Sequence, residues 1–177
     1  ATIWPSGARA LTSWDESGNL ASITPPGRPA TTMQYDGVDQ LVKETAPVAA
    51  GSAGTGETRY DYDTDHALKT VTRANGDQIL LGYTPANGRL ETLDYPGRHV
   101  GYDYDPQGRL QAAQVTGGQR TTYAYDGALP TGETWSGLVA GSTSRSYDTH
   151  GRPASSTVNG DTVSYSYDPD GVPTSAG

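Results

Sequence analysis

Tyrosines recur two positions apart in short segments along the chain. The pairs are Tyr60/Tyr62, Tyr102/Tyr104, Tyr123/Tyr125 and Tyr165/Tyr167. Residues two apart on a β-strand point to the same face of the sheet. The pattern therefore predicts strands whose tyrosines form a ladder on one face of a sheet.

Aliphatic residues downstream of these segments follow a different spacing. Leu20 and Ile23 are three apart, as are Leu68 and Val71. On a regular strand such residues lie on opposite faces, unless a β-bulge intervenes. The sequence alone leaves these alternatives open.

An aromatic-Asp pair, or a variant of it, marks a repeat of about 21 residues. The copies are Trp14-Asp15, Tyr35-Asp36, Tyr62-Asp63, Tyr83-Thr84, Tyr104-Asp105, Tyr125-Asp126, Tyr147-Asp148 and Tyr167-Asp168. The intervals between the aromatic residues are 21, 27, 21, 21, 21, 22 and 20. A fixed period of this kind is typical of tandem repeat architectures.

In six of these copies the aspartate of the pair opens a predicted turn. Asp105-Pro106-Gln107-Gly108 has the composition of a type I turn, with Asp accepting a hydrogen bond at the first position and Gly at the fourth. Two copies place Asp39 and His66 at the fourth position. Asp and His are among the non-glycine residues that best tolerate a positive φ. We predict that both adopt it.

A second turn follows some eleven to thirteen residues after each aromatic residue. Its Asn-Gly and Gly-Gly pairs, such as Asn75-Gly76 and Asn159-Gly160, predict two-residue hairpin loops with positive φ. The longest interval contains the small-residue segment 46–56, which predicts a flexible loop at one of these second turns. The predicted fold is all-β, a tandem array of antiparallel β-hairpins.

Composition and charge argue against several classes of protein. Hydrophobic residues make up 33%, with 12 Tyr, 23 Gly and no Phe or Cys, which disfavours helical packing and excludes disulfides. The net charge of -8, without a basic cluster, argues against nucleic-acid binding. No run of about eighteen apolar residues predicts a membrane span. We expect residues 1–177 to form a single array of about eight repeats.

Tyr102-Asp-Tyr-Asp-Pro-Gln-Gly-Arg-Leu110, with its weaker copies, resembles the YD repeats of Rhs (rearrangement hotspot) proteins, of Tc toxin shells and of teneurins. The resemblance extends from about Trp14 to Asp168. It implies a curved, spiralling β-sheet strip or partial shell. In bacterial members that shell encloses a C-terminal toxin, and in teneurins the repeats belong to a cell-surface adhesion receptor.

The resemblance implies a structural scaffold, not an enzyme, in a secreted or cell-surface protein. Its expected partners are the remainder of its own shell and an encapsulated effector domain, and we expect no cofactor. Bacterial shells end in a self-cleaving segment with paired Asp-Pro-x-Gly motifs. Asp105-Pro-Gln-Gly108 and Asp168-Pro-Asp-Gly171 match that string but fall on ordinary repeat turns, so this activity is not carried over. The open strand edges predict weak self-association.

Residues 61–66, Asp-Tyr-Asp-Thr-Asp-His, form the strongest candidate for a metal site because they resemble the start of a calcium loop. An EF-hand requires Gly where His66 stands and Glu where Thr72 stands, so we expect no metal site.

The other residues that could act in catalysis are spread over separate copies of the repeat. The three histidines, His66, His99 and His150, fall in separate copies, and acid pairs such as Asp103/Asp105 recur at several positions. We therefore expect neither catalytic nor cofactor-binding residues. The alternative function is an adhesion or carbohydrate-binding module that uses the tyrosine ladder or loop 46–56 as its contact surface.

Overall fold

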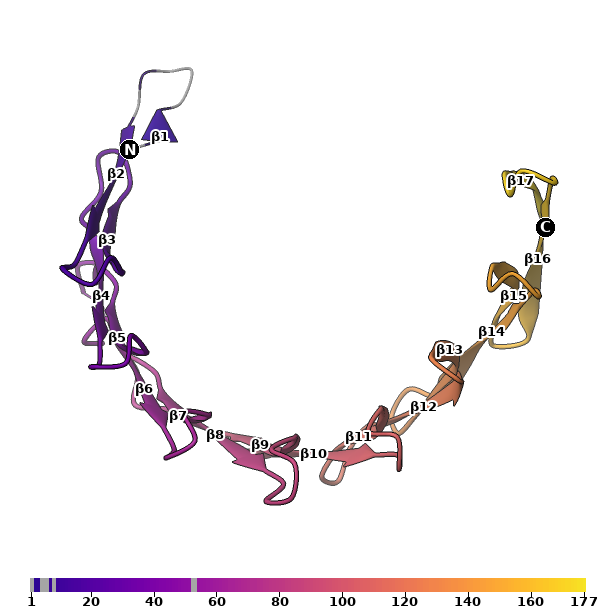
Figure 1. The fold of residues 1–177 in the computed structure, drawn as a ribbon. Helices are drawn as coiled ribbons and strands as arrows, with labels where there is room; N and C mark the ends of the chain where they lie inside the picture. The colour runs from indigo at the N-terminus through magenta and orange to yellow at the C-terminus, as the bar shows by residue number, and fades with distance from the viewer. Residues whose placement is uncertain (1, 4–6, 8, 52–53) are drawn as a thin grey trace. The chain divides into compact units, whose positions relative to one another are not determined.

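The computed structural model describes residues 2–3, 7, 9–51 and 54–177, and none of them forms a helix. The prediction of an all-β array of hairpins is confirmed (Figure 1). The strands are β1 (Thr2–Ile3), β2 (Arg9–Trp14), β3 (Leu20–Thr24), β4 (Thr31–Tyr35), β5 (Leu41–Thr45), β6 (Glu57–Tyr62), β7 (Leu68–Thr72), β8 (Gln78–Tyr83), β9 (Leu90–Tyr95), β10 (Arg98–Tyr104), β11 (Leu110–Val115), β12 (Arg120–Asp126), β13 (Leu129–Ser136), β14 (Gly141–Tyr147), β15 (Pro153–Val158), β16 (Asp161–Tyr167) and β17 (Pro173–Ala176).

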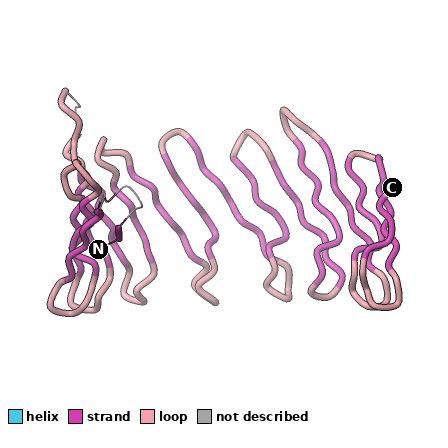
Figure 2. The backbone as a smooth tube through the Cα atoms, turned by 90° about the horizontal axis from the view of Figure 1, so that it is seen from above, coloured by secondary structure: helices cyan, strands magenta, loops and turns pink. Residues whose placement is uncertain are grey.

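The chain divides into two compact units. The first contains Ala1–Pro85 and Leu93–Gly97, and the second contains Ala86–Thr92 and Arg98–Gly177. In the first unit, β1 to β8 pair in chain order, each antiparallel to the next. In the second unit, β10 to β17 pair in the same way. Strands within a unit lie side by side and reverse at turns along two edges (Figure 2).

A β-bulge follows the first turn of the repeats. It explains how aliphatic residues three positions apart can lie on the same face of the sheet. In β2 and β3, Trp14 pairs with Leu20 whereas Ser13 pairs with Ser22, so Ala21 is an extra residue. Because one extra residue reverses the alternation, Leu20 and Ile23 point to the same face. The same register shift occurs before Tyr35, Tyr62, Tyr104, Tyr125, Tyr147 and Tyr167.

The bulges give the two faces of the sheet different compositions. Tyr60 lies opposite Val71 and Tyr62 opposite Leu68, so these side chains share one face, here called the tyrosine face. The opposite, polar face carries serine and threonine in the second unit. There, the hydroxyl groups of Ser146 and Ser155 lie 2.7 Å apart.

Little of the molecule is shielded from solvent. Among the residues that the structure describes, Ala112 alone is fully buried. Strands contact only their neighbours in the sequence within each unit. Because no second layer covers the sheet within either unit, the contacts between successive repeats must carry most of its stability.

The second turns differ from one another more than the sequence predicted. Asn159 and Gly160 both have positive φ, 50° and 101°, as expected for a two-residue loop. At Asn75-Gly76 only Gly76 does, at 88°. Here the Gly76 N–H donates to the Arg73 carbonyl and the Arg73 N–H donates to the Asp77 carbonyl. The loop is therefore one residue longer and repeats the hydrogen bonds of the first turn.

The segment 46–56 connects β5 to β6 at one of the second turns. The two strands remain paired, with Lys43 opposite Arg59, and the Ala46 N–H donates to the Gly56 carbonyl at the neck of the loop. Residues 52–53, within the segment predicted to be flexible, lie outside the described residues.

Candidate functional site

The aspartate of the repeat motif forms the hydrogen bonds of the first turn. In Asp148-Thr149-His150-Gly151, the Gly151 N–H donates to the Asp148 carbonyl, and the Asp148 carboxylate accepts the backbone N–H groups of His150 and Arg152. Gly151 has a φ of 75°. The same backbone bond and the same carboxylate bond to the residue four places on occur at Asp15, Asp36, Asp63, Asp105 and Asp168. These aspartates each fix a turn.

The tyrosine of the motif joins one repeat to the previous one. The Tyr167 hydroxyl donates to the Pro153 carbonyl oxygen, 2.8 Å away, beside the bulged residue Ala154. Equivalent bonds of 2.8 to 3.1 Å run from Tyr35 to Leu20, Tyr62 to Leu41, Tyr83 to Leu68, Tyr104 to Leu90, Tyr125 to Leu110 and Tyr147 to Pro130. A bulge disrupts the local ladder, so the hydroxyl supplies a donor where strand pairing is irregular.

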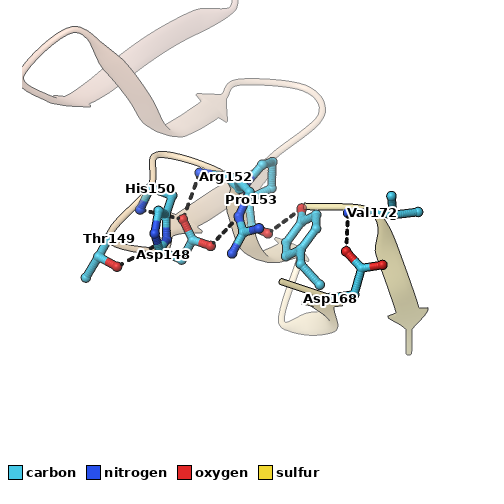
Figure 3. A network of polar contacts seen from close by, with 8 residues as sticks. Asp148, Thr149, His150, Arg152, Pro153, Asp168 and Val172 are labelled. Atoms are coloured by element: carbon cyan, nitrogen blue, oxygen red, sulfur yellow. Dashed lines mark hydrogen bonds and ion pairs between the residues drawn. The ribbon is translucent and has the colours of Figure 1, made fainter. Parts of the chain in front are cut away.

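The contact between the tyrosine of one repeat and the previous repeat is here called the joint. An arginine also contributes to it. The Arg152 Nε donates to the Asp148 carboxylate at 2.7 Å, and its guanidinium lies over the ring of Tyr167 in the next repeat. Arg109 makes the same contacts with Asp105 and Tyr125. Figure 3 shows the Asp148 turn, Arg152 and Pro153 in one network beside the Asp168 turn. The residues of the Tyr-Asp-x-x-Gly-Arg-Leu motif therefore form an interlock between repeats.

The electrostatics of the interlock favour the ionised carboxylate. The pKa of Asp148 is lowered because the Arg152 backbone N–H and guanidinium bind the charged form more strongly than burial disfavours it. At Asp105, burial is the largest single effect and acts to raise the pKa. The combined hydrogen bonds from Arg109 outweigh it, so this pKa is lowered too.

The hydroxyls of Tyr62 and Tyr83 are held in their neutral form. Burial raises the pKa of Tyr62 and Tyr83, with a smaller contribution from the nearby aspartate of the preceding turn. A neutral phenol is the form that can donate to a carbonyl. At Tyr62 and Tyr83 the phenol is thus in the protonation state that its hydrogen bond requires near neutral pH.

The side chains of the candidate calcium segment, residues 61–66, make separate structural contacts and do not converge on one point. Asp63 fixes its turn, and His66 occupies the positive-φ position, with its Nδ1 2.9 Å from the Gln40 side-chain oxygen. In the ranges that the structure describes, no three or more His, Asp or Glu side chains are grouped to hold a metal ion.

The other candidate residues are engaged separately. Asp105 is bound by Arg109, whereas Asp103 lies 3.4 Å from Arg120. His150 supplies a backbone N–H to the Asp148 turn, and the His99 carbonyl accepts the Thr116 N–H. The Asp-Pro-x-Gly strings at Asp105 and Asp168 form ordinary first turns.

Sequence reasoning found the tyrosines of one row of side chains but missed the arginine that belongs to it. Two residues before the YD aromatic, the second unit carries Tyr102, Tyr123, Arg145 and Tyr165 on the tyrosine face. Within the described residues, the three tyrosine hydroxyls of this row make no hydrogen bond, unlike those of the YD tyrosines. An alignment of the repeats against one another would have revealed the replacement of tyrosine by Arg145.

Comparisons with known proteins agree with the repeat pattern and the fold. The family model named RHS Repeat matches residues 14–53. Structures of TcdB2-TccC3-Cdc42 and of TcdB2-TccC3 without its hypervariable C-terminal region superpose with TM-scores of 0.75 and 0.74. Each is 15% identical and covers 92% of this chain. Residues 14–53 carry an Rhs repeat, and the YD motif recurs as far as Asp168.

A Tc holotoxin pore from Photorhabdus luminescens also matches this array of hairpins, with a TM-score of 0.75 and 15% identity over 90% of the chain. The array spans only 10% of the length of each of these three solved chains. No curated protein matches it. The described residues include no helix long and apolar enough to cross a membrane.

Proposed function

We propose that this array is a section of the wall of a β-sheet shell that encloses a C-terminal toxin or effector domain of a secreted protein. The observation that carries the proposal is the interlock. The Tyr-Asp-x-x-Gly-Arg-Leu motif is used for a turn and for a joint to the neighbouring repeat. A motif used in this way serves architecture, and we propose no catalytic role for it.

The proposal extends to the organisation of the parent protein. Residues 1–177 would be one continuous array within a larger shell, with the segment 46–56 as a loop on its edge. The remaining shell and the enclosed effector would be its partners, and the likeness to Tc toxin complexes supports an extracellular location.

Protease protection in the full-length parent protein would test this function. If the repeats wall off an effector, that domain should survive protease in the intact protein and be digested when expressed alone. Tyr167→Phe combined with Tyr125→Phe, which removes two joints, should expose the effector to digestion. Equal digestion of the enclosed and the free domain would contradict encapsulation.

Weak self-association is a separate proposal about the isolated array. In the described residues, β17 pairs with β16 and has no strand on its other side. Such an edge presents unpaired backbone groups that can bind a second strand. Analytical ultracentrifugation should show the mean mass rising with concentration, and a constant monomer mass over a wide range would contradict the proposal.

A carbohydrate-binding module is the second candidate function. The observation that favours it is the row of tyrosines whose hydroxyls have no partner in the described structure. Phenol rings offer an apolar face for a sugar ring and a hydroxyl for its polar edge. If the array were only a scaffold, we would expect every tyrosine hydroxyl to bond a neighbouring repeat, and this row would not exist.

A further inference from the structure

Two of the second turns contain the same tripeptide, Asn-Gly-Asp, at residues 75–77 and 159–161. In both, the asparagine and the glycine are exposed. An asparagine before a glycine can lose its side-chain amide without an enzyme, because the following backbone nitrogen can attack the side-chain carbonyl carbon and glycine has no Cβ in the way. Local sequence and exposure therefore give the two turns the same reactivity, and any difference must come from the hydrogen bonds of the fold.

In the first of these turns the reacting groups are engaged. The Gly76 N–H donates to the Arg73 carbonyl at 2.9 Å. The Asn75 Nδ2 donates to the Asp77 carboxylate at 2.7 Å, and the Asp77 N–H donates to the Asn75 side-chain oxygen at 3.0 Å. The nitrogen of Gly76 must lose its proton before it can attack, so its bond to Arg73 has to break first. The Asp77 carboxylate also opposes the negative charge that then forms beside it.

In the second turn the same groups are available. Within the described structure, the Gly160 N–H and the Asn159 Nδ2 make no hydrogen bond. The Asn159 side-chain oxygen accepts the Ser142 N–H at 2.8 Å, and this donor is placed to bind the oxygen when it gains negative charge on attack. Asn75 has an equivalent donor in the Asp77 N–H. The two turns therefore differ at the attacking glycine nitrogen and at the leaving amide nitrogen.

We propose that Asn159 is a site of spontaneous modification, where the chain converts its own asparagine to isoaspartate and aspartate. The Gly160 nitrogen gives its proton to solvent and bonds to the Asn159 Cγ. The Cγ–Nδ2 bond then breaks, and the amide nitrogen takes up a proton from water and leaves as ammonia. Water opens the five-membered imide that results. Opening at the former side-chain carbonyl gives aspartate, and opening at the main-chain carbonyl gives isoaspartate, so water is the only co-reactant.

The isoaspartate product changes how this turn contacts the neighbouring strand. Asn159 donates its N–H to the Ser142 carbonyl at 2.9 Å and accepts the Ser142 N–H, so one residue holds the turn between β15 and β16 against β14. Isoaspartate adds a methylene carbon to the main chain of a loop that has only two residues between the paired Val158 and Asp161. We expect the lengthened loop to lose its bonds to Ser142. The reaction thus loosens this edge of the sheet with time.

Peptide mapping by mass spectrometry measures both turns in one sample. The folded 177-residue chain is incubated at mildly alkaline pH, which favours loss of the glycine proton, in water enriched in oxygen-18. The heavy oxygen marks products formed during the incubation and separates them from products formed during digestion. Asn159 should convert about tenfold faster than Asn75, the factor expected from one hydrogen bond that must first break at Gly76. Equal rates, or faster conversion of Asn75, would overturn the proposal.

The unfolded chain is the matched control, because the two tripeptides are identical. In concentrated urea the rates at Asn75 and Asn159 should become closely similar. In the folded chain, Asp77→Ser should speed conversion of Asn75 by removing the carboxylate from its amide, whereas Asp161→Ser should leave Asn159 unchanged. A rate difference that persisted in urea would show that the fold does not cause it and would overturn the assignment to these hydrogen bonds.

Two variants test the effect of the modification on the sheet. Asn159→Asp copies the aspartate product. Its carboxylate can still accept the Ser142 N–H and tolerates the φ of 50°, so its urea midpoint should stay close to that of the fresh chain. The aged chain, which also contains isoaspartate, should have a lower midpoint. Asn159→Gly keeps a residue that accepts positive φ but cannot react, so its midpoint should fall less on ageing.

An unchanged urea midpoint after complete conversion of Asn159 would contradict the loosening of this edge. These measurements need neither the enclosed effector nor a ligand. Their failure would leave the proposed shell function untouched, and failure of protease protection would leave the modification of Asn159 untouched.

Discussion

The guanidinium of Arg152 lies 4.4 Å from the centroid of the Tyr167 ring, although the two residues belong to successive repeats. The same arginine is bound to Asp148 within its own repeat at 2.7 Å. It thereby connects the turn of one repeat to the aromatic residue of the next. Arg109, over Tyr125 at 4.6 Å, repeats the relationship.

Replacing Arg152 by glutamine should therefore loosen the joint without unfolding the array. We expect a loss of about 0.5–1 kcal/mol, the usual size of an arginine-aromatic contact near solvent. Urea denaturation checks this. Arg145→Gln, which removes an arginine that has no bonded partner in the described structure, is the control and should leave the midpoint unchanged. Equal losses in the two variants would contradict the interlock.

Tyr167→Phe should also destabilise the array. The Tyr167 hydroxyl donates to Pro153, whereas Tyr165, on the same strand, has no hydroxyl partner in the described residues. Removing one net hydrogen bond costs about 0.5–1.5 kcal/mol. Tyr165→Phe removes the same atom without that bond and should have little effect. Denaturation midpoints that move equally would show that the hydroxyl bond contributes nothing.

Gly108→Val should weaken the fold by about 1–3 kcal/mol. Gly108 has a φ of 83°, and a Cβ there would collide with the Arg89 guanidinium. Gly101→Ala is the matched control, because a Cβ at Gly101 meets nothing within 4 Å and its φ is ordinary. Chemical denaturation of both variants distinguishes the turn requirement from a general cost of replacing glycine. An unchanged midpoint for Gly108→Val would mean that the turn is not as described.

The first turns could be predicted from sequence because their interactions are local. Asp39 and His66 were expected to replace glycine at positive φ, and their φ values are 63° and 64°. The second turn at Asn75 was less predictable. The number of residues in such a loop depends on how the flanking strands pair, which the Asn-Gly pair alone does not determine.

The joints between repeats could not be predicted. Whether Leu68 and Val71 share a face depends on a bulge, and the bulge is defined only by the partner strand. The bond from Tyr83 to the Leu68 carbonyl likewise depends on the stacking of two repeats. Sequence reasoning identified the residues of the motif and the turn they form, but not the interlock.

Acid should weaken the array through the aspartates of the interlock. The pKa values of Asp105 and Asp148 are lowered from the ordinary 3.8, chiefly by hydrogen bonds from Arg109 and Arg152. A carboxyl group with a lowered folded pKa stabilises the fold above its ordinary value. That contribution is lost as the pH falls from about 3.8 through the folded pKa values. The urea midpoint of the unaltered chain should therefore drop below about pH 4.

The double variant Asp105→Asn, Asp148→Asn tests this assignment. An amide oxygen can still accept the backbone N–H groups of the turn, but it cannot titrate or form the ion pairs with Arg109 and Arg152. The variant should be less stable than the unaltered chain at neutral pH, and the difference should shrink as the solution is acidified, because both proteins then lack the charges. Asp126→Asn is the control, since the Asp126 side chain makes no hydrogen bond or ion pair in the described residues. Parallel curves of urea midpoint against pH for the double variant and the unaltered chain would show that these two aspartates do not carry the acid sensitivity.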